Sequence, residues 1–463
     1  MADDLLNELT ALQHTMTHAS AADLHTLGKQ LRARVPLDSL AHRPLIQRDP
    51  VAFIQAIETN LTATLLPARH AKMAASPAAF FRGTAELMAY DLSHGAQSGI
   101  RVLSDGDAHL QNFGFYASPE RNLLFDLNDF DEAAPNAFEF DVKRLITSVY
   151  LLGAQAHFEE AVLDELARQI VRTYRKTVKK AFKQGALTRF YASSAVTTLM
   201  QALPDQADVD FIAKIRDRAA TRDSESVVKK YTEPIDGALR FKVAPPRTVR
   251  VTAATEAALR QGFIDYQHTT RADVALLLSQ YHLTDMVRHA VGIGSFGTSC
   301  YLLLLTGLNG SHLVLQIKEA LPRRRVLAPN DITVDQRREI SEGQRIIAAQ
   351  QILQKASDPF LGWFNQLDKS FYVRQFRDMK ESIDPLALSW PQFEAYSHVC
   401  AYLLALAHTQ SPSAAVAAGY MDKHLDGAIQ HWCKDYLGQV IDDYAAFVAA
   451  FAPAPALRRA ADR

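Results

Sequence analysis

Cysteine is scarce in this chain of 463 residues. Only three occur, at Cys300, Cys400 and Cys433, and none forms a CxxC pair. A scattered, odd-numbered set of this kind argues against a disulfide framework and against a zinc site. The cysteine content therefore fits a protein of the reducing cytosol.

The chain also lacks an apolar run long enough to span a bilayer, since the longest, such as 301–307 and 401–408, are far too short. Its start, MADDLLNELT, is acidic and has no basic region followed by an apolar stretch, so we expect no secretory signal. The formal net charge of −1 gives no general attraction to nucleic acid or to an anionic membrane. We expect a cytoplasmic protein with neither of these partners, and the sequence leaves its oligomeric state open.

No internal repeat is visible, and the composition is that of an ordinary globular protein, with 48% hydrophobic and 22% charged residues. The length exceeds what one compact core usually holds. The pattern predicts an α+β fold with a large helical lobe and a small antiparallel-sheet lobe. We assign 1–230 to the first part of the helical lobe, 231–380 to the sheet lobe, and 381–463 to helices that complete the helical lobe.

Local signals refine this division. The patterns predict a helix that stops near Pro36, helices over 50–92 with a break at Ser76-Pro77, strands in 100–130, helix over 139–182, a hairpin turning at Asp236-Gly237, helix near 253–279, strands in 285–318, a helix over 334–356, a strand at 370–376, and helices over 391–452.

The first motif lies in VGIGSFGTSCYLLLLTG, where Gly292, Gly294 and Gly297 form a GxGxxG pattern that also contains Ser295. The pattern alone is weak. Its apolar flanks place it at the tip of a strand–turn–strand hairpin, with Lys318 on the next strand. This layout is that of the phosphate clamp of protein kinases.

The clamp has a direct physical logic. Glycines let backbone N–H groups approach phosphate oxygens, and a neighbouring lysine adds a compact positive charge. A glutamate on the following helix can hold the lysine in place, and Glu342 is the first choice, with Glu339 close behind. Each feature has an ordinary alternative, namely a hairpin tip and a solvated surface lysine, but together they favour a nucleotide site.

The second motif is SDGDAHLQNFGF, a loop between two expected strands. Kinase-type transfer needs an aspartate that accepts or orients the proton of the attacking hydroxyl, and an asparagine five residues later that holds Mg²⁺. Asp107 and Asn112 have this spacing. A second aspartate bridges the metal to the phosphates, and Asp129 follows the next apolar run. The alternative is a solvated acidic loop.

GDAHLQNFGF and LNDFDEA resemble motifs of the aminoglycoside and choline kinase branch of the kinase-like superfamily. The resemblance implies that Asp141, in FEFDVKRL, braces the catalytic loop through backbone contacts. His109 matches the motif histidine, with its role left open, and Asp131 would be a further neighbour of the metal.

The order of the two motifs is the reverse of that in kinases, where the glycine loop and lysine come first. The resemblance therefore implies a two-lobed kinase-like fold that is circularly permuted. The alternative is that one of the two motif sets is a coincidence.

A broader resemblance runs from about residue 28 to 450, through blocks that include LLPARHAKMAASPAAFFRGTAELMAYDL, GDAHLQNFG, VGIGSFGT and FYVRQFRDMK. These blocks are similar to an uncharacterised bacterial family, the domain of unknown function 2252 family. Arg82, in FFRG, would either face the phosphates or form a buried ion pair.

The leading interpretation is a phosphotransferase that uses ATP and Mg²⁺ and acts on a hydroxyl of a small molecule, although the acceptor itself is beyond the sequence. Two alternatives remain open: a non-catalytic, pseudokinase-like regulator that binds ATP, and transfer of a nucleotidyl group from the same cleft.

Overall fold

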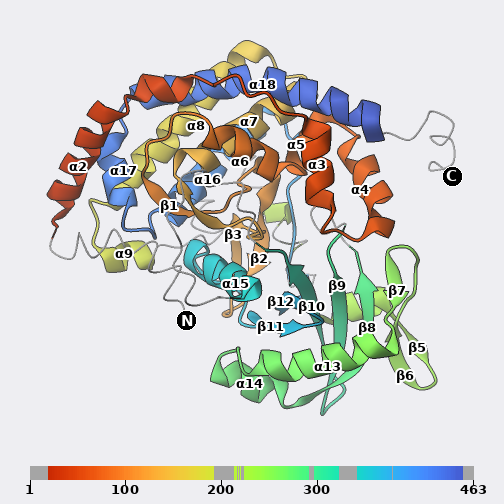
Figure 1. Cartoon of the computed structure of the whole chain (residues 1–463). Helices are drawn as coiled ribbons and strands as arrows, with labels where there is room; N and C mark the ends of the chain where they lie inside the picture. The colour runs from red at the N-terminus through yellow and green to blue at the C-terminus, as the bar shows by residue number, and fades with distance from the viewer. Residues whose placement is uncertain are drawn as a thin grey trace.

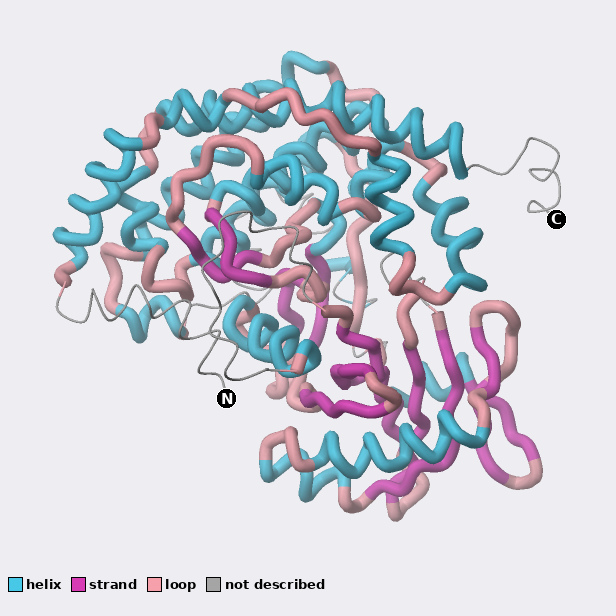
Figure 2. Tube along the Cα trace, viewed as in Figure 1, coloured by secondary structure: helices cyan, strands magenta, loops and turns pink. Residues whose placement is uncertain are grey.

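The computed structural model describes residues 19–191, 213–215, 217, 219, 224–290, 297–322, 341–377 and 379–451. These residues form a mixture of helices and antiparallel strands (Figure 2). Helices gather on one side of the molecule, which we call the helical part, and a six-stranded sheet with its covering helices lies on the other, which we call the sheet part (Figure 1). The expected α+β class is confirmed.

The helical part draws on both ends of the chain. Its helices are α2 (Ala21–Arg34), α3 (Pro50–Glu58), α4 (Leu66–Met73), α5 (Pro77–Arg82), α6 (Ala85–Ser93), α7 (Glu139–Gln155), α8 (Glu160–Ala181), α9 (Ala186–Phe190), α16 (Trp390–His408), α17 (Ala414–Tyr420) and α18 (His424–Phe451), with short 3-10 helices at Leu37–Ala41, Ala63–Leu65, Leu110–Asn112 and Pro385–Ala387. The break at Ser76-Pro77 is confirmed, because the Ser76 side chain caps α5 and the proline takes its first position.

Helix α7 lies at the centre of this part and is buried from Glu139 to Gly153. The long helix α18 packs against α7 and α8, so C-terminal residues cover the helices that follow the loops after β1 and β3 (Figure 1). One apolar core contains buried side chains of all three helices. Helices from the first and the last part of the described chain therefore share one core.

The six-stranded sheet has the order β11-β12-β10-β9-β8-β7, with every neighbouring pair antiparallel. Its strands are β7 (Thr248–Arg250), β8 (Tyr281–His289), β9 (Cys300–Gly307), β10 (His312–Ala320), β11 (Gly362–Gln366) and β12 (Lys369–Gln375). The predicted strand at 370–376 is therefore confirmed, and the strands expected on either side of the glycine motif are β8 and β9, which pair antiparallel.

Both faces of the sheet are covered. Helices α13 (Ala253–Gln267) and α14 (Ala272–Leu278) pack on one face through Leu259, Phe263 and Leu278. The other face receives α12 (Ser224–Tyr231) and the hairpin of β5 (Thr232–Ile235) and β6 (Ala238–Phe241). This hairpin turns at Asp236-Gly237, both with positive φ, as the sequence predicts. Helix α15 (Glu342–Leu353) connects β10 to β11.

Two small two-stranded sheets position the acidic loops. Strand β1 (Arg101–Ser104) pairs with β4 (Ala134–Ala137), and β2 (Phe113–Ala117) pairs with β3 (Leu123–Leu127). Ser104 lies opposite Ala134, and Phe113 lies opposite Leu127. The loop after β1 therefore begins beside the end of the loop after β3, and it ends beside the point where that loop begins.

One buried histidine of the sheet gives a test of the fold that is independent of function. His289 at the end of β8 is 1% exposed, and its Nδ1 lies 2.8 Å from the Thr248 hydroxyl. Burial, with the charges of Arg247 and Arg377, lowers its pKa to about 4. The folded protein keeps this side chain neutral at pH 5, whereas the unfolded chain protonates it below pH 6.5.

We expect His289 to lower the free energy of unfolding by about 2 kcal/mol as the pH falls from 7 to 5, because only the unfolded state gains the proton. Urea unfolding of His289→Gln at both pH values should lack this part of the decline. The exposed His431→Gln is the control and should follow the wild type. A decline in His289→Gln as steep as in the wild type would contradict the assignment.

Candidate active site

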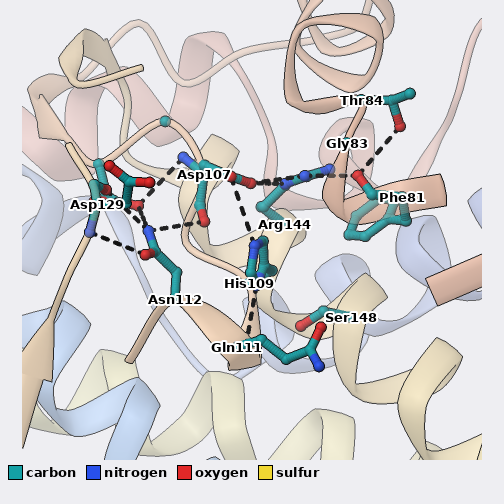
Figure 3. A network of polar contacts seen from close by, with 12 residues as sticks. Phe81, Gly83, Thr84, Asp107, His109, Gln111, Asn112, Asp129, Arg144 and Ser148 are labelled. Atoms are coloured by element: carbon teal, nitrogen blue, oxygen red, sulfur yellow. Dashed lines mark hydrogen bonds and ion pairs between the residues drawn. The ribbon is translucent and has the colours of Figure 1, made fainter. Parts of the chain in front are cut away.

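Asn112 joins the two acidic loops. Its amide nitrogen donates to the carboxylate of Asp105 at 2.8 Å and to the carbonyl of Asp129 at 3.0 Å, and its amide oxygen accepts the Asp129 N–H at 3.1 Å (Figure 3). The side chain is buried. Asn112 therefore fixes the separation of the loops, and its amide oxygen, which accepts one hydrogen bond, keeps a second lone pair for the metal that the sequence predicts.

Asp107 is held by an arginine that the sequence interpretation did not use. Its Oδ1 accepts from Nε and Nη2 of Arg144 at 2.9 and 2.7 Å, and the same Nη2 donates to the Phe81 carbonyl (Figure 3). Burial raises the pKa of Asp107 to about 6 against the opposing charge of Arg144. The carboxylate is therefore mostly ionised at pH 7, with one oxygen anchored.

His109 lies beside the other oxygen of Asp107, with Nε2 3.6 Å from Oδ2. Its Nδ1 accepts the backbone N–H of Gln111 at 3.0 Å, so in the neutral ring the proton is on Nε2 and faces the aspartate. Burial, together with Arg82 and Arg144, lowers the pKa of His109 well below its usual value. The ring is therefore neutral, and its Nε2–H faces Asp107 from beyond hydrogen-bond distance.

Lys318 lies on β10 with only 2% of its surface exposed. Its Nζ is 3.2 and 3.4 Å from the two carboxylate oxygens of Asp129, which is 189 positions away in the sequence, and it also bonds to Asp131. The predicted approach of Asp129 and Lys318 is confirmed. Burial opposes the charge on the lysine, but Asp129 and Asp131 outweigh it and raise the pKa of Lys318 well above its usual value.

Asp129 is the more open of these two carboxylates, with its side chain 45% exposed. Burial would raise its pKa, but the positive charges of Lys318, Arg374 and Lys380 prevail and lower it to about 2. It is therefore ionised at every physiological pH. Its exposure leaves it able to bind a cation as well as the lysine.

The predicted partnership of Glu342 with Lys318 is wrong. Within the part of the chain that the structure describes, the lysine bonds to Asp129 and Asp131, and Glu342 pairs with Arg345 one turn further along α15. Arg345 in turn donates to the carbonyls of Asp131 and Ala133 at 2.9 and 2.7 Å. Glu342 therefore contacts the arginine that holds the Asp131 loop.

Asp131, predicted as a neighbour of the metal, uses both carboxylate oxygens within the protein. One bonds to Lys318, and the other accepts from the Tyr372 hydroxyl at 2.7 Å. It takes the position relative to the lysine that the sequence interpretation gave to a helical glutamate. A metal role for Asp131 stays a prediction.

Gly297 is the part of the glycine motif that can be described, because Gly292, Gly294 and Ser295 lie outside the described residues, as does Glu339. Its φ of +123° and the closeness of Leu61, 2.8 Å from an added Cβ, require glycine. Its carbonyl accepts the N–H of Thr62 at 2.7 Å. The motif therefore ends against the helical part.

These groups surround a cavity between the two parts of the molecule. Its lining includes Arg82, Asp107, Asp129, Asp131, Glu319 and Arg345. Among the described residues, no group of three or more His, Cys, Asp or Glu side chains is arranged to hold a metal on its own. A cation here would need ligands from a bound molecule or from water in addition to Asp129.

Asp141 braces the loop, as the resemblance implies. It is 1% exposed and accepts the N–H groups of Asp105 and Gly106 at 2.7 and 3.0 Å. His408 of α16 contacts it at 3.0 Å through Nε2 and bonds to the Tyr174 hydroxyl through Nδ1. The sequence interpretation missed this support from α8 and α16, and no spacing in the sequence indicates it.

We expect Asp141→Asn to lower the free energy of unfolding by about 3 kcal/mol, because the amide nitrogen would face an N–H group in a buried site. Urea unfolding monitored by circular dichroism measures this. Asp384→Asn, an exposed capping residue, makes the same change of charge and should be nearly neutral. Equal stability of the two variants would remove Asp141 from the brace.

Asp105 and Arg144 were also missed. Asp105 is fully buried, and burial followed by the charges of Asp141 and Asp107 raises its pKa well above the usual value. Its Oδ1 has no hydrogen-bond partner among the described residues. Arg144 could have been found, because it follows Asp141 by three positions and so lies on the same face of α7.

The fold and site define an α+β protein in which a strand lysine contacts two aspartates of one loop, beside a second acidic loop, at a cavity between the two parts of the molecule. The chain belongs to the family described as "uncharacterized protein conserved in bacteria (DUF2252)", whose model matches residues 61–450. The match begins later than residue 28, where the resemblance in sequence was expected to begin. No curated protein and no solved structure matches the chain.

Across the described residues, no helix combines the length and apolar character needed to cross a membrane.

Proposed function

We propose that this protein is a phosphotransferase that uses Mg-ATP and phosphorylates a hydroxyl group of a small molecule, on a circularly permuted kinase-like fold. The observation that carries the proposal is the contact between Asp129 and Lys318 at 3.2 Å beside a loop with the Asp-x₄-Asn spacing. Kinases place their metal-binding aspartate and strand lysine on the same nucleotide phosphates.

The sheet supports the same proposal. Three antiparallel strands follow one another as β8-β9-β10, the glycine motif lies between β8 and β9 in the sequence, Lys318 is on β10, and α15 is the next described helix. This is the order of glycine loop, lysine strand and helix in kinases. The departure is that Asp131 replaces the helical glutamate beside the lysine.

The residues divide the work of transfer. Asp107 is ionised at pH 7, and it would accept the proton as the acceptor oxygen forms its bond to the γ-phosphorus. The bond from this phosphorus to the β–γ bridging oxygen breaks, and ADP leaves with the electron pair. Arg144 holds Asp107 in position, His109 lies beside it, and Lys318 would bind the phosphates. Asp129 would hold Mg²⁺, which would supply positive charge to offset that of the phosphates.

Two measurements on the full chain test the proposal. A thermal-shift titration with ATP, with and without Mg²⁺, should give stabilisation that depends on the metal. Mass spectrometry of products from a mixture of hydroxyl compounds should then find a phosphate added. Addition of AMP would replace phosphoryl by nucleotidyl transfer, and metal-dependent binding without turnover of ATP would indicate a regulator. No binding of ATP would refute the proposal.

A further inference from the structure

Arg82 is a half-buried side chain at the end of α5 that the proposed chemistry leaves unused. It lines the main cavity with Asp107 and Asp129, and it also lines a smaller hollow with His109. The positive charge of Arg82 lowers the pKa of His109, and only burial has a larger effect. Arg82 therefore lies on the side of the cavity where the catalytic loop would receive an acceptor.

The guanidinium of Arg82 forms no hydrogen bond or ion pair with the residues that the structure describes. The other arginines that line the cavity have partners: Arg69 pairs with Glu58 and donates to the Gly83 carbonyl, and Arg345 pairs with Glu342. A guanidinium offers five N–H donors in a planar fork that matches carboxylate and phosphate groups. Arg82 thus retains its full capacity to bind an anion.

The backbone that carries Arg82 is held from both sides. Arg69 donates to the Gly83 carbonyl at 2.9 Å, and Thr84 donates to the Phe80 carbonyl at 3.0 Å. Arg144 bonds to the Phe81 carbonyl and to Asp107 at once, so one side chain links the end of α5 to the catalytic loop (Figure 3). A fixed backbone of this kind pre-organises a binding group.

Further positive charge lies near Arg82. Burial, followed by the charges of Arg247 and Arg82, lowers the pKa of Lys72, so these three cations lie within electrostatic reach of one another. They come from α4, from α5 and from the segment before β7. A different set of cations, which includes Lys318, serves Asp129. The acidic centre therefore has Arg82 in the same cavity lining as Asp107 and Asp129, in addition to Lys318 on Asp129, and the proposed function uses only the lysine.

We propose that Arg82 binds a phosphate or carboxylate group of the acceptor, so that the substrate is an anionic hydroxyl compound. This inference rests on the proposed phosphotransferase function. The anion would be anchored on one side of Asp107 while the nucleotide phosphates occupy the side of Lys318. Neutral polyols would then be poor acceptors.

The test uses the full chain saturated with Mg²⁺ and a non-hydrolysable ATP analogue, which fills the nucleotide side first. Inorganic phosphate and acetate are then titrated by calorimetry into the wild type, Arg82→Gln, Arg82→Lys and Arg101→Gln. Arg101 is a matched control because it is half-buried and lies outside the cavity lining. We expect Arg82→Gln to bind at least one of the anions about tenfold more weakly, Arg82→Lys to be intermediate, and Arg101→Gln to match the wild type.

Equal binding by the wild type and Arg82→Gln, or no binding of either anion to the wild type, would overturn the inference. Failure of the analogue to bind would count against the proposed function instead, and the titration of anions would then be repeated without nucleotide. As a second readout, glycerol, glycerate and glycerol 3-phosphate are compared as acceptors. Faster consumption of ATP with glycerol than with both anions would also overturn the inference.

Discussion

Asp107→Asn is expected to lose turnover by about 10² to 10⁴-fold while its affinity for Mg-ATP changes little, because the amide cannot accept a proton from the acceptor hydroxyl. Asp129→Asn is expected to lose turnover and also the part of the nucleotide affinity that depends on Mg²⁺, because an amide cannot replace a carboxylate against a dication. Calorimetric titration of ATP with and without Mg²⁺ separates the two variants.

The structure sharpens this comparison. Asp107 forms an ion pair with the buried Arg144, whereas Asp129 has a partly exposed side chain beside Lys318. Asp107→Asn should therefore show a loss of stability that Asp129→Asn does not share, and unfolding curves without nucleotide serve as the control. Equal losses of Mg-ATP affinity in both variants would show that the two aspartates do not divide the work in this way.

Lys318→Met is expected to lose more than about tenfold in affinity for Mg-ATP, because the phosphates would lose a direct positive charge and its N–H donors. From sequence, a lysine in a surface cleft would be dispensable for folding. The side chain is instead buried between Asp129 and Asp131. We therefore also expect a loss of about 2 kcal/mol in stability, less than for a fully buried pair because Asp129 is 45% exposed.

Lys242→Met, an exposed lysine of the same part of the chain, is the matched control and should leave both quantities unchanged. Thermal shift with and without Mg-ATP measures stability and binding in one experiment. Full retention of the Mg-ATP-dependent shift in Lys318→Met would exclude the lysine as a phosphate ligand.

Local patterns in the sequence were sufficient to place the elements of the site. The apolar flanks of VGIGSFGT predicted the β8–β9 hairpin, and Asp236-Gly237 predicted the turn between β5 and β6. Asp107 and Asn112, which have the Asp-x₄-Asn spacing, lie on one loop, and Asp129 lies on the adjacent loop, as a shared site requires. Each of these features depends on neighbours in the sequence, where periodicity and turn chemistry carry information.

The partners of these groups could not be predicted, because periodicity identifies the buried face of an element and leaves open which distant element covers it. Lys318 pairs with Asp131 because the loop after β3 reaches the sheet. Glu342, in the first turn of α15, pairs instead with Arg345 of the same helix. The support of Asp141 by His408 joins residues 267 positions apart. The kinase-like, permuted fold itself stays a prediction.

The most direct measurement is a crystal structure of the full chain with Mn²⁺ in place of Mg²⁺ and a non-hydrolysable ATP analogue, with the metal located by its anomalous signal. We predict an anomalous peak bonded to the carboxylate of Asp129 and to phosphate oxygens, with Lys318 on the same phosphates and Asp107 facing the γ-phosphate. A nucleotide bound elsewhere, or a metal that does not contact Asp129, would contradict the central claim.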